Sequence, residues 1–408
     1  MLSRPDIAVT GLGMLTPAGL DVPSTWNRVC DGKPTAATAG QLAALPVDFV
    51  CSLPPLDVPA HLGRRTAHRL DRSTQLAVIA AQEAIADAGL DPQTWNGARV
   101  GVVIGCGVGA SHTWEAQAQR LRDGGPRRVS PLLLPKIGPS TPAGEIALAY
   151  GAQGPSLATA TACASGATAL VIASSLLTSG QCDVVIAGGT ESCNTPLIVT
   201  GLAQLGALST RCDDPAAASR PFDQARDGFV LGEAAAILIL ERAPDAAARG
   251  RRPRALLAGC GSTTDAYHPT APHPDGRGIQ QAIRTALADA DLSPHDITHV
   301  NAHGTSTLLN DAVEAEAIRT VLPNGPHVTS TKGVLGHSLG ATGAVEAALT
   351  VLAVQNSLIP PTANLERPDP ACELNFVTRT AVSSRIDAAV THSFGFGGHN
   401  VVLAFRAS

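Results

Sequence analysis

The 408-residue sequence is poor in aromatic and charged residues, and these shortages exclude several classes of function. Phe, Trp and Tyr make up 3% of the chain, and they do not alternate with basic residues as they do in RNA-binding motifs. The formal net charge is −5, so the chain has no surplus of positive charge for a phosphate backbone. We therefore expect no nucleic-acid partner.

The sequence also lacks a long apolar segment. No apolar run approaches the roughly 20 residues that span a bilayer. The first residues, MLSRPDIAVTGLG, pass from charged residues straight into a short strand-like segment, which is unlike a secretory signal peptide. We expect a soluble, cytoplasmic protein with no membrane partner.

The nine cysteines follow no pairing or metal-binding pattern. No CxxC motif occurs, and no spacing of Cys and His matches a zinc site. Cysteines of cytosolic proteins are normally kept reduced. The sequence therefore predicts neither disulfides nor a bound metal.

The chain does contain an alternation of strand-like and helix-like segments, which is typical of layered α/β folds. Two pairs of segments also match each other. The helix and strand predicted over 76–105 resemble those over 279–304, and the strand and helix over 156–170 resemble those that begin at 327. We expect two similar α/β halves, residues 1–250 and 251–408, with the seam near the Arg- and Ala-rich stretch that follows Leu240.

Cys163 lies in TACASG, where a strand-like run gives way to an apolar helix. Backbone N–H groups at a helix start favour an anion, and thiols placed there have lowered pKa values and greater nucleophilicity. A small buried cysteine that only fills space would give the same local pattern. The position makes Cys163 a candidate nucleophile with a lowered thiol pKa.

Two histidines lie in comparable settings. His303 ends a strand in NAHGTST, and His337 lies in KGVLGHSLGATG, where a glycine-rich turn opens an apolar helix. Ligands bind at strand ends in α/β folds. Together with Cys163, the two imidazoles form a Cys/His/His set suited to acyl transfer. The internal repeat further predicts that Cys163 and His337 occupy related strand-to-helix junctions.

Two competing motifs also occur. GCGVGA follows a strand but lacks the spacing of a dinucleotide-binding loop, so we expect no nucleotide. GHSLG matches the G-x-S-x-G elbow of serine hydrolases, with Ser338 as the nucleophile. The acid and the histidine would then come from Asp369 or Asp387 and from His392 or His399. A serine hydrolase is therefore the alternative function.

Several longer motifs occur in the same order as in the β-ketoacyl-acyl carrier protein synthases. They are TACASG, NAHGTST followed by Asn310 and Asp311, STKGVLGHSLGATGAVEAA and SFGFGGHNVVLAF, and VTGLGMLTP and ASRPFDQARDGFVLGEAAAILILE fit as well. Over essentially its whole length the chain resembles the elongating Cys-His-His type of condensing enzyme, found in fatty acid synthesis and as the type II polyketide ketosynthase. The resemblance implies a thiolase-like fold with five αβαβα layers built from two duplicated halves.

The same resemblance implies a role for each candidate residue. Cys163 would take an acyl chain from acyl carrier protein as a thioester. His303 and His337 would donate hydrogen bonds to the enolate that forms when malonyl-carrier protein loses carbon dioxide. The backbone N–H groups of Cys163 and Phe396 would bind the oxyanion, and Lys332, paired with a glutamate in the next helix (Glu346), would position the site.

Substrate contacts are also implied by the resemblance. Thr305 and Thr307 match the threonines that hydrogen-bond the phosphopantetheine arm on which substrates arrive, so no resident cofactor is expected. Phe396 would act as a gate to the acyl pocket. Val108 would lie beside the acyl chain, and Leu133 would reach into the pocket from the partner subunit.

Acyl carrier proteins are acidic, so a basic docking face is expected despite the negative net charge. The candidates are five arginines that lie in two short segments of the N-terminal half: Arg64, Arg65, Arg69, Arg127 and Arg128. Ordinary solvated arginines would look the same in the sequence.

Three questions stay open at this point. The product is a fatty acid or a polyketide of unspecified chain length, and the chain forms a homodimer or a heterodimer with a ketosynthase-like chain-length subunit. The three candidate catalytic side chains argue against this chain being the non-catalytic subunit. A degradative thiolase would need a second cysteine near the C-terminus, and GFGGHN contains none.

Overall fold

The computed structural model describes residues 6–408, and its centre is a mixed ten-stranded sheet with the order β10-β9-β13-β14-β8-β1-β7-β6-β4-β5. Residues 1–5 belong to the predicted N-terminal half and to the segment judged unlike a signal peptide, and they lie outside the described residues. No helix among the described residues is long and apolar enough to cross a membrane.

Each half of the chain contributes five strands to this sheet. Those of the N-terminal half are β1 (Ile7–Leu15), β4 (Val100–Gly105), β5 (Ser156–Thr159), β6 (Val184–Glu191) and β7 (Ala234–Arg242). Those of the C-terminal half are β8 (Ala255–Thr264), β9 (Ile297–Asn301), β10 (His327–Thr329), β13 (Ala388–Gly395) and β14 (His399–Arg406). Two small sheets pair β2 (Ala37–Thr38) with β3 (Phe49–Val50) and β11 (Leu358–Ile359) with β12 (Val382–Ser383).

The two sets of strands have the same topology, which confirms the predicted duplication. In each half the strands, numbered in chain order, lie in the spatial order third, second, fourth, fifth, first. The pairings β5-β4-β6 and β10-β9-β13 are parallel, whereas β6-β7-β1 and β13-β14-β8 are antiparallel. The halves meet where β1 pairs with β8, from Ile7↔Leu257 to Val9↔Ala255.

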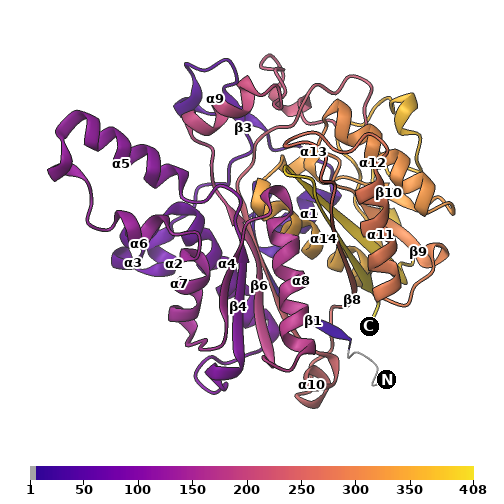
Figure 1. Cartoon of the computed structure of the whole chain (residues 1–408), viewed down its shortest axis with the longest axis horizontal. Coiled ribbons are helices and arrows are strands. Elements are labelled where there is room, and N and C mark those ends of the chain that lie inside the picture. Colours follow the sequence, from indigo (N-terminus) through magenta and orange to yellow (C-terminus); the bar gives the residue numbers. More distant parts are fainter. Residues whose placement is uncertain (1–5) are drawn as a thin grey trace.

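Helices cover the sheet in three layers, as Figure 1 shows. α4 (Arg72–Ala88) and α7 (Thr141–Tyr150) pack on the outer face of the N-terminal strands. α11 (Arg277–Asp289) packs on the outer face of the C-terminal strands, with α12 (Leu308–Val321) beside it. α8 (Ser165–Thr178) and α14 (Thr342–Asn356) lie between the halves and contact strands of both. The five strands of each half form one β layer, so the three helix layers and two β layers give the order αβαβα.

The remaining helices lie at the edges of these layers. They are α1 (Val22–Cys30), α2 (Val58–Leu62), α3 (Arg64–Arg69), α5 (Ser111–Gly124), α6 (Leu133–Ile137), α9 (Pro196–Gln204), α10 (Ala243–Ala248) and α13 (Lys332–Leu335). In Figure 1, α5 projects from the side of the N-terminal half, next to α3 and α6.

Glycines in the first strand of each half allow the outer helix to pack closely. A Cβ atom at Gly11 or Gly13 of β1 would overlap the backbone of α4, and one at Gly259 or Gly261 of β8 would overlap the backbone of α11. Side chains at these positions would push helix and strand apart, because protein interiors are closely packed. The same device at equivalent positions is a second sign of the duplication.

The middle layer has the strongest burial. Every residue of α14 from 342 to 354 is buried, because strands of both halves cover it. A helix enclosed in this way is apolar nearly all round, and the charged residue of α14, Glu346, is paired with Lys332. This explains why the predicted helices after Cys163 and His337 have no polar face.

Candidate active site

A cavity of about 480 Å³ lies where the strands β4, β5, β9 and β13 end. The exposed lining residues Leu205, at the end of α9, and Leu308 and Leu309, at the start of α12, mark its mouth. The cavity brings together residues that are far apart in the sequence. It is lined by seven of the predicted residues: Val108, Cys163, His303, Thr305, Thr307, His337 and Phe396. Parallel strands place their carboxyl ends at one edge, which is why these segments converge.

Cys163 lies in a short 3-10 turn, η4 (Ala162–Ala164), between β5 and α8. The side chain is buried, with 8% of the residue exposed. Burial raises the pKa of the Cys163 thiol to about 12, and the Lys332 charge and the backbone N–H groups of Phe396 and Cys163 oppose this only in part. The expected lowered pKa is therefore wrong, because loss of hydration outweighs the favourable field at the helix start.

The hairpin turn between β13 and β14 closes the cavity beside Cys163. Gly395 packs so tightly there that a Cβ atom would lie 3.1 Å from the backbone nitrogen of Cys163. The next residue, Phe396, is 38% exposed and lines the cavity, and its N–H lowers the thiol pKa. Two backbone N–H groups thus point toward the sulfur, which is the arrangement that an oxyanion requires.

His303 is fixed by contacts to its backbone and to its ring. Its backbone N–H donates to Glu314 Oε1 at 2.7 Å, and Lys332 Nζ lies 3.3 Å from its Nδ1. Because an ammonium group can only donate, Nδ1 accepts and the proton of the neutral ring lies on Nε2. Burial, followed by the charge of Lys332 and by His337, holds the pKa of His303 well below its usual range. His303 is therefore a neutral donor at neutral pH.

The His337 ring packs edge to face against the His303 ring. The ring centroids are 5.3 Å apart, and the planes meet at 84°. The backbone of His337 is held by hydrogen bonds to the chain segment before β7, with its N–H 2.7 Å from the carbonyl oxygen of Val230. Burial, assisted by the charge of Lys332, lowers the pKa of His337 well below the usual value. Two neutral imidazoles therefore line the cavity with Cys163.

Lys332 and Glu346 lie behind His303 and do not line the cavity. Lys332 Nζ is 2.5 Å from Glu346 Oε1 and 2.5 Å from the carbonyl oxygen of His303. Both side chains are 1% exposed. Burial raises the pKa of Glu346 to about 7, although Lys332 opposes the shift. The pair anchors the loop that carries His303, in keeping with its predicted positioning role.

Of the predicted substrate contacts, Thr305, Thr307 and Val108 line the cavity, whereas Leu133 does not. The hydroxyl oxygens of Thr305 and Thr307 are 2.9 Å apart, and both residues line the cavity. Val108 also lines it and is 44% exposed. Leu133 begins α6 and does not reach the cavity of its own chain, so its role remains tied to a partner subunit.

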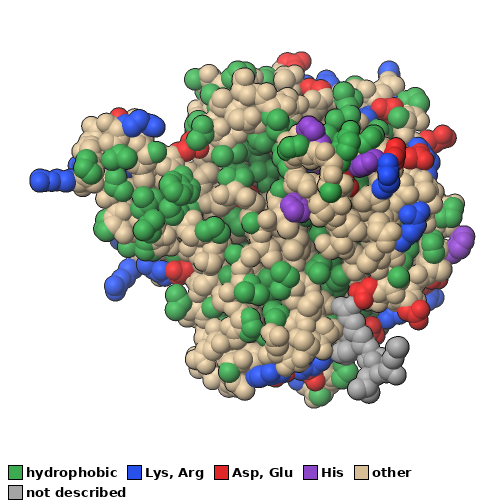
Figure 2. Space-filling view, viewed as in Figure 1, with side chains coloured by type: hydrophobic (Ala, Val, Ile, Leu, Met, Phe, Trp, Pro, Cys, Tyr) green, Lys and Arg blue, Asp and Glu red, His purple; other side chains and the backbone are tan. Residues whose placement is uncertain are grey.

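The predicted docking arginines lie on the side of the molecule where α5 projects. Arg64 and Arg65 in α3 are exposed, and so are Arg127 and Arg128 in the turn after α5. Figure 2 shows Lys and Arg side chains on this projection. Arg69 differs, because its Nη2 lies 2.6 Å from Glu145 Oε2 and its charge is therefore compensated within the chain.

The structure gives no support for a serine hydrolase. Asp369 pairs with Arg226 at 2.6 Å, Asp387 with Arg385 at 2.9 Å, and His392 with Glu314 at 2.9 Å. The candidate acids and one candidate histidine are therefore engaged elsewhere. In the GHSLG turn the strained residue with positive φ is Leu339 and not Ser338, in contrast to a nucleophile elbow.

Two buried carboxylates that the sequence analysis missed hold the loops of the site. Glu314 accepts the backbone N–H groups of His303 and Gly304. Glu191, the last residue of β6, accepts those of residues 107–109 and of Gly340. A charged residue at the end of the apolar run VVIAGGTE was the available signal for Glu191, because buried carboxylates are normally paired.

Comparison with known proteins identifies the family. The model of the β-ketoacyl synthase N-terminal domain matches residues 4–246, and that of the C-terminal domain matches residues 254–366. The chain is 43% identical to 3-oxoacyl-[acyl-carrier-protein] synthase 2 of Synechocystis sp., over 99% of each chain.

Solved structures give the same result. The ishigamide ketosynthase/chain length factor matches with a TM-score of 0.94 and 30% identity over 100% of both chains. A type II polyketide synthase acyl-carrier protein in complex with its ketosynthase, bound to the hexaketide, matches with a TM-score of 0.92 and 32% identity over 100% of both chains. The fold is thiolase-like, and the chain belongs to the β-ketoacyl synthase family.

Proposed function

We propose that this chain is a 3-oxoacyl-acyl carrier protein synthase, which lengthens an acyl chain by decarboxylative Claisen condensation with malonyl-acyl carrier protein. The observation that carries the proposal is the cavity that Cys163 shares with the neutral imidazoles of His303 and His337. Membership of the family and the synthase names of its relatives support it.

The first step transfers the acyl chain to the protein. The Cys163 sulfur attacks the thioester carbonyl of an acyl-carrier protein, and the carrier leaves as a free thiol that takes up the proton of the Cys163 thiol. Because burial raises the thiol pKa to about 12, this proton must leave as the sulfur attacks. The N–H groups of Cys163 and Phe396 stabilise the tetrahedral oxyanion.

The second step forms the new carbon–carbon bond. Malonyl-carrier protein loses carbon dioxide, and the electron pair of the broken bond forms an enolate. The enolate carbon attacks the Cys163 thioester, the C–S bond breaks, and the sulfur takes up a proton to restore the thiol. Neutral imidazoles at His303 and His337 suit this step, because they donate to the enolate oxygen while quenching the carbanion less readily than imidazolium would.

The substrates in this scheme arrive on the phosphopantetheine arm of a carrier protein, so the proposal includes no resident cofactor or metal. Thr305 and Thr307 at the mouth would bind the arm. The exposed arginines Arg64, Arg65, Arg127 and Arg128 would attract the acidic carrier, and Arg69 would contribute less because Glu145 compensates its charge.

We infer that the working unit is a dimer, in which residues 1–250 and 251–408 form the two halves of each ketosynthase chain in the cytoplasm. The partner is a second copy or a chain-length subunit, and the ketosynthase/chain length factor structure supports the second form. The pathway is fatty acid or type II polyketide biosynthesis. The synthase 2 relative favours the first, and the polyketide synthase neighbour favours the second.

Intact-protein mass spectrometry tests the proposal. Wild-type protein mixed with acyl-carrier proteins of several chain lengths should gain one acyl mass, located at Cys163. Ser338→Ala should be acylated like the wild type, whereas Cys163→Ala should not be acylated at all. Acylation of Cys163→Ala at another residue, or loss of acylation in Ser338→Ala, would overturn the assignment.

A further inference from the structure

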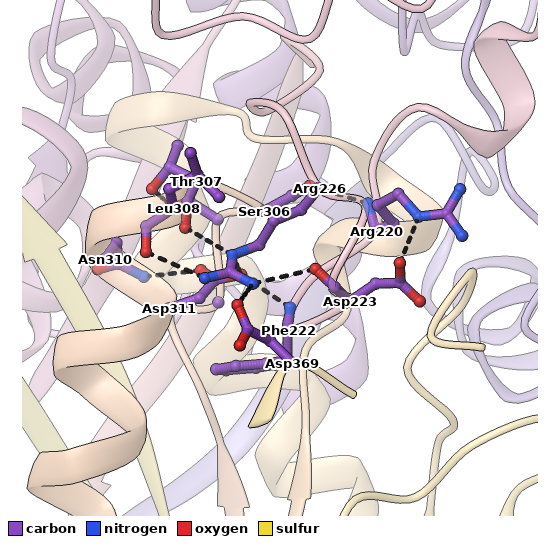
Figure 3. A network of polar contacts seen from close by, with 12 residues as sticks. Arg220, Phe222, Asp223, Arg226, Ser306, Thr307, Leu308, Asn310, Asp311 and Asp369 are labelled. Atoms are coloured by element: carbon purple, nitrogen blue, oxygen red, sulfur yellow. Dashed lines mark hydrogen bonds and ion pairs between the residues drawn. The ribbon is translucent and has the colours of Figure 1, made fainter. Parts of the chain in front are cut away.

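The motif ASRPFDQARDGF carries two buried arginines that none of the steps above uses. Arg226 is 4% exposed and Arg220 is 8% exposed. Figure 3 shows both in a network of polar contacts with the loop before α12. A buried guanidinium group needs several acceptors and a compensating charge, so its partners reveal what it holds in place.

The Arg226 side chain hydrogen-bonds the backbone at the point where the loop with Thr305 and Thr307 becomes α12. Its Nε donates to the carbonyl oxygen of Thr307 and its Nη2 to that of Leu308, both at 3.1 Å. Its charge is compensated by Asp369 Oδ2, 2.6 Å from Nη1, and by Asp311 Oδ2, 3.6 Å from Nε. The rigid guanidinium fork thus fixes two successive carbonyl groups at the start of α12, where Figure 3 shows them converging on it.

The loop that Arg226 binds contains a strained residue, which the neighbouring segment holds by hydrogen bonds. Ser306 has a φ of 68°, which is unfavourable for a residue with a side chain. Its carbonyl oxygen accepts the N–H of Gly228, and its Oγ accepts the N–H of Arg220, both at 3.0 Å. These contacts hold the residue between the two threonines, and Arg226 holds the residues that follow. The whole segment is therefore fixed from one side by residues 220–228.

We propose that Arg226 is a positioning residue for the carrier's phosphopantetheine arm: by holding the carbonyl groups of Thr307 and Leu308, it fixes the hydroxyl groups of Thr305 and Thr307 at the cavity mouth. The two hydroxyl oxygens lie 2.9 Å apart and form a small polar patch next to the exposed apolar side chains of Leu308 and Leu309. This inference rests on the proposed function, because it assigns the loop to the arm of a carrier thioester.

The test compares two conservative variants of the same network. Arg226→Lys keeps the positive charge between Asp311 and Asp369 but replaces the fork with a single point, so it cannot hold both carbonyl groups. Arg220→Lys is the matched control, because the Arg220 side chain pairs with Asp223 and does not touch the Thr307 or Leu308 carbonyl group. Its backbone bond to Ser306 is unaffected by the substitution.

Four quantities are measured for each variant: the KM and the kcat for acylation of Cys163 by an acyl-carrier protein, the rate of Cys163 alkylation by iodoacetamide, and the melting temperature. For Arg226→Lys we expect KM to rise on the order of 10-fold, with kcat and alkylation close to wild type, since misplaced binding groups weaken positioning. For Arg220→Lys we expect an unchanged KM. Iodoacetamide carries no pantetheine arm, so it reports the thiol alone.

The outcomes separate this inference from the proposed function. An unchanged KM in folded Arg226→Lys, an equal rise in both variants, or alkylation that falls in step with acylation would overturn the inference alone. A wild-type protein that no acyl-carrier protein acylates would overturn the proposed function, and the inference with it. If Arg226→Lys does not fold, Asp369→Asn takes its place, because the half-buried Asp369 holds Arg226 from outside and its loss should raise KM in the same direction.

Discussion

The two halves of the chain contain equivalent strand-to-helix junctions, but they carry different side chains there. Ala162 (φ 48°) and Leu339 (φ 43°) open equivalent 3-10 turns, η4 before α8 and η7 (Leu339–Ala341) before α14. The next residue is Cys163 in one half and Gly340 in the other. Counted from the strained residue, the true counterpart of Cys163 is therefore Gly340, and His337 lies three residues earlier in the related junction.

The loops after the second strand of each half show the reverse pattern. Gly105 and Asn301 occupy equivalent ladder positions, opposite Thr159 and Thr329. Two residues further on, the C-terminal half carries His303, and the N-terminal half carries Gly107. Cys163 and His303 thus each have a glycine as their counterpart in the other half.

The difference teaches how one working site arises from two similar halves. A Cβ atom at Gly340 would overlap the backbone nitrogen of Gly107 and lie 2.7 Å from Glu191 Oε2. The second, symmetry-related position is therefore packed shut by backbone and by a buried carboxylate. The cavity of the candidate site lies where one half supplies the thiol and the other supplies both imidazoles. We expect the following changes to break or sharpen this contrast.

The largest effect should come from removing either of the two imidazoles that the C-terminal half supplies. His303→Ala and His337→Ala should each lose about 2.7–4 kcal/mol of transition-state stabilisation, because each removes a preorganised donor to the enolate. Malonyl-carrier decarboxylation measured by release of carbon dioxide should therefore fall by roughly 10²–10³-fold. Acylation of Cys163 should persist at least in part, and normal decarboxylation in both variants would refute the division of roles.

A methyl group at the closed position should act on stability. Gly340→Ala should lower the free energy of unfolding by about 3 kcal/mol, because the new atom would lie 2.2 Å from the backbone nitrogen of Gly107, which Glu191 holds by a hydrogen bond. Urea denaturation followed by circular dichroism measures this change. Cys163→Ala is the matched control at the open junction and should change stability by less than about 1 kcal/mol. Equal stability of both variants would contradict the contrast.

Enlarging the side chain beside the cavity should change which acyl chains are accepted. The counterpart of Val108 is Gly304 in the other half, so the N-terminal loop alone offers a side chain at this point. If Val108 borders the acyl chain, Val108→Phe should block long acyl donors and spare acetyl or butyryl donors, at an unchanged melting temperature. Competition between donors, read by mass spectrometry, gives the answer. Equal loss for every donor length would leave Val108 without a role in selection.

The pH dependence of thiol reactivity should show the smallest but most diagnostic effect. With a pKa of about 12, Cys163 should be alkylated by iodoacetamide about tenfold faster for each unit from pH 7 to 9, with no plateau. The sign follows because alkylation requires the thiolate, whose share rises with pH until the pKa is reached. Rates that level off near pH 8 would instead support the lowered pKa expected from the helix start.

Local sequence signals predicted the parts of the site that depend on chain order. The matching stretches 76–105 and 279–304 contain ADAGLDP and ADADLSP, which lie at the C-terminal ends of the equivalent helices α4 and α11. The motifs around Cys163 and His303 lie after strand ends. The five layers followed from the family resemblance, because periodicity alone does not arrange helices around a sheet.

Other features depend on packing and could not be predicted from the sequence. The raised pKa of Cys163 arises from burial by segments distant in the sequence, which outweighs the local helix start. Glu191 holds a loop more than 80 residues earlier in the chain, so no short motif contains the contact. The match between Cys163 and Gly340 was missed because a glycine carries no sign of the side chain that its position could hold.

The order of the strands in the sheet also governs how the protein can fold during synthesis. β1 lies between β7 and β8, so during synthesis it stays unpaired until the strands that begin at Ala234 and Ala255 have been made. β14 (His399–Arg406) lies between β13 and β8, so β8 likewise lacks this partner until residues 399–406 have been made. Contacts this distant in sequence make folding slow and leave strand edges unpaired on the ribosome. We therefore expect newly made chains to be prone to aggregation until β14 has been made.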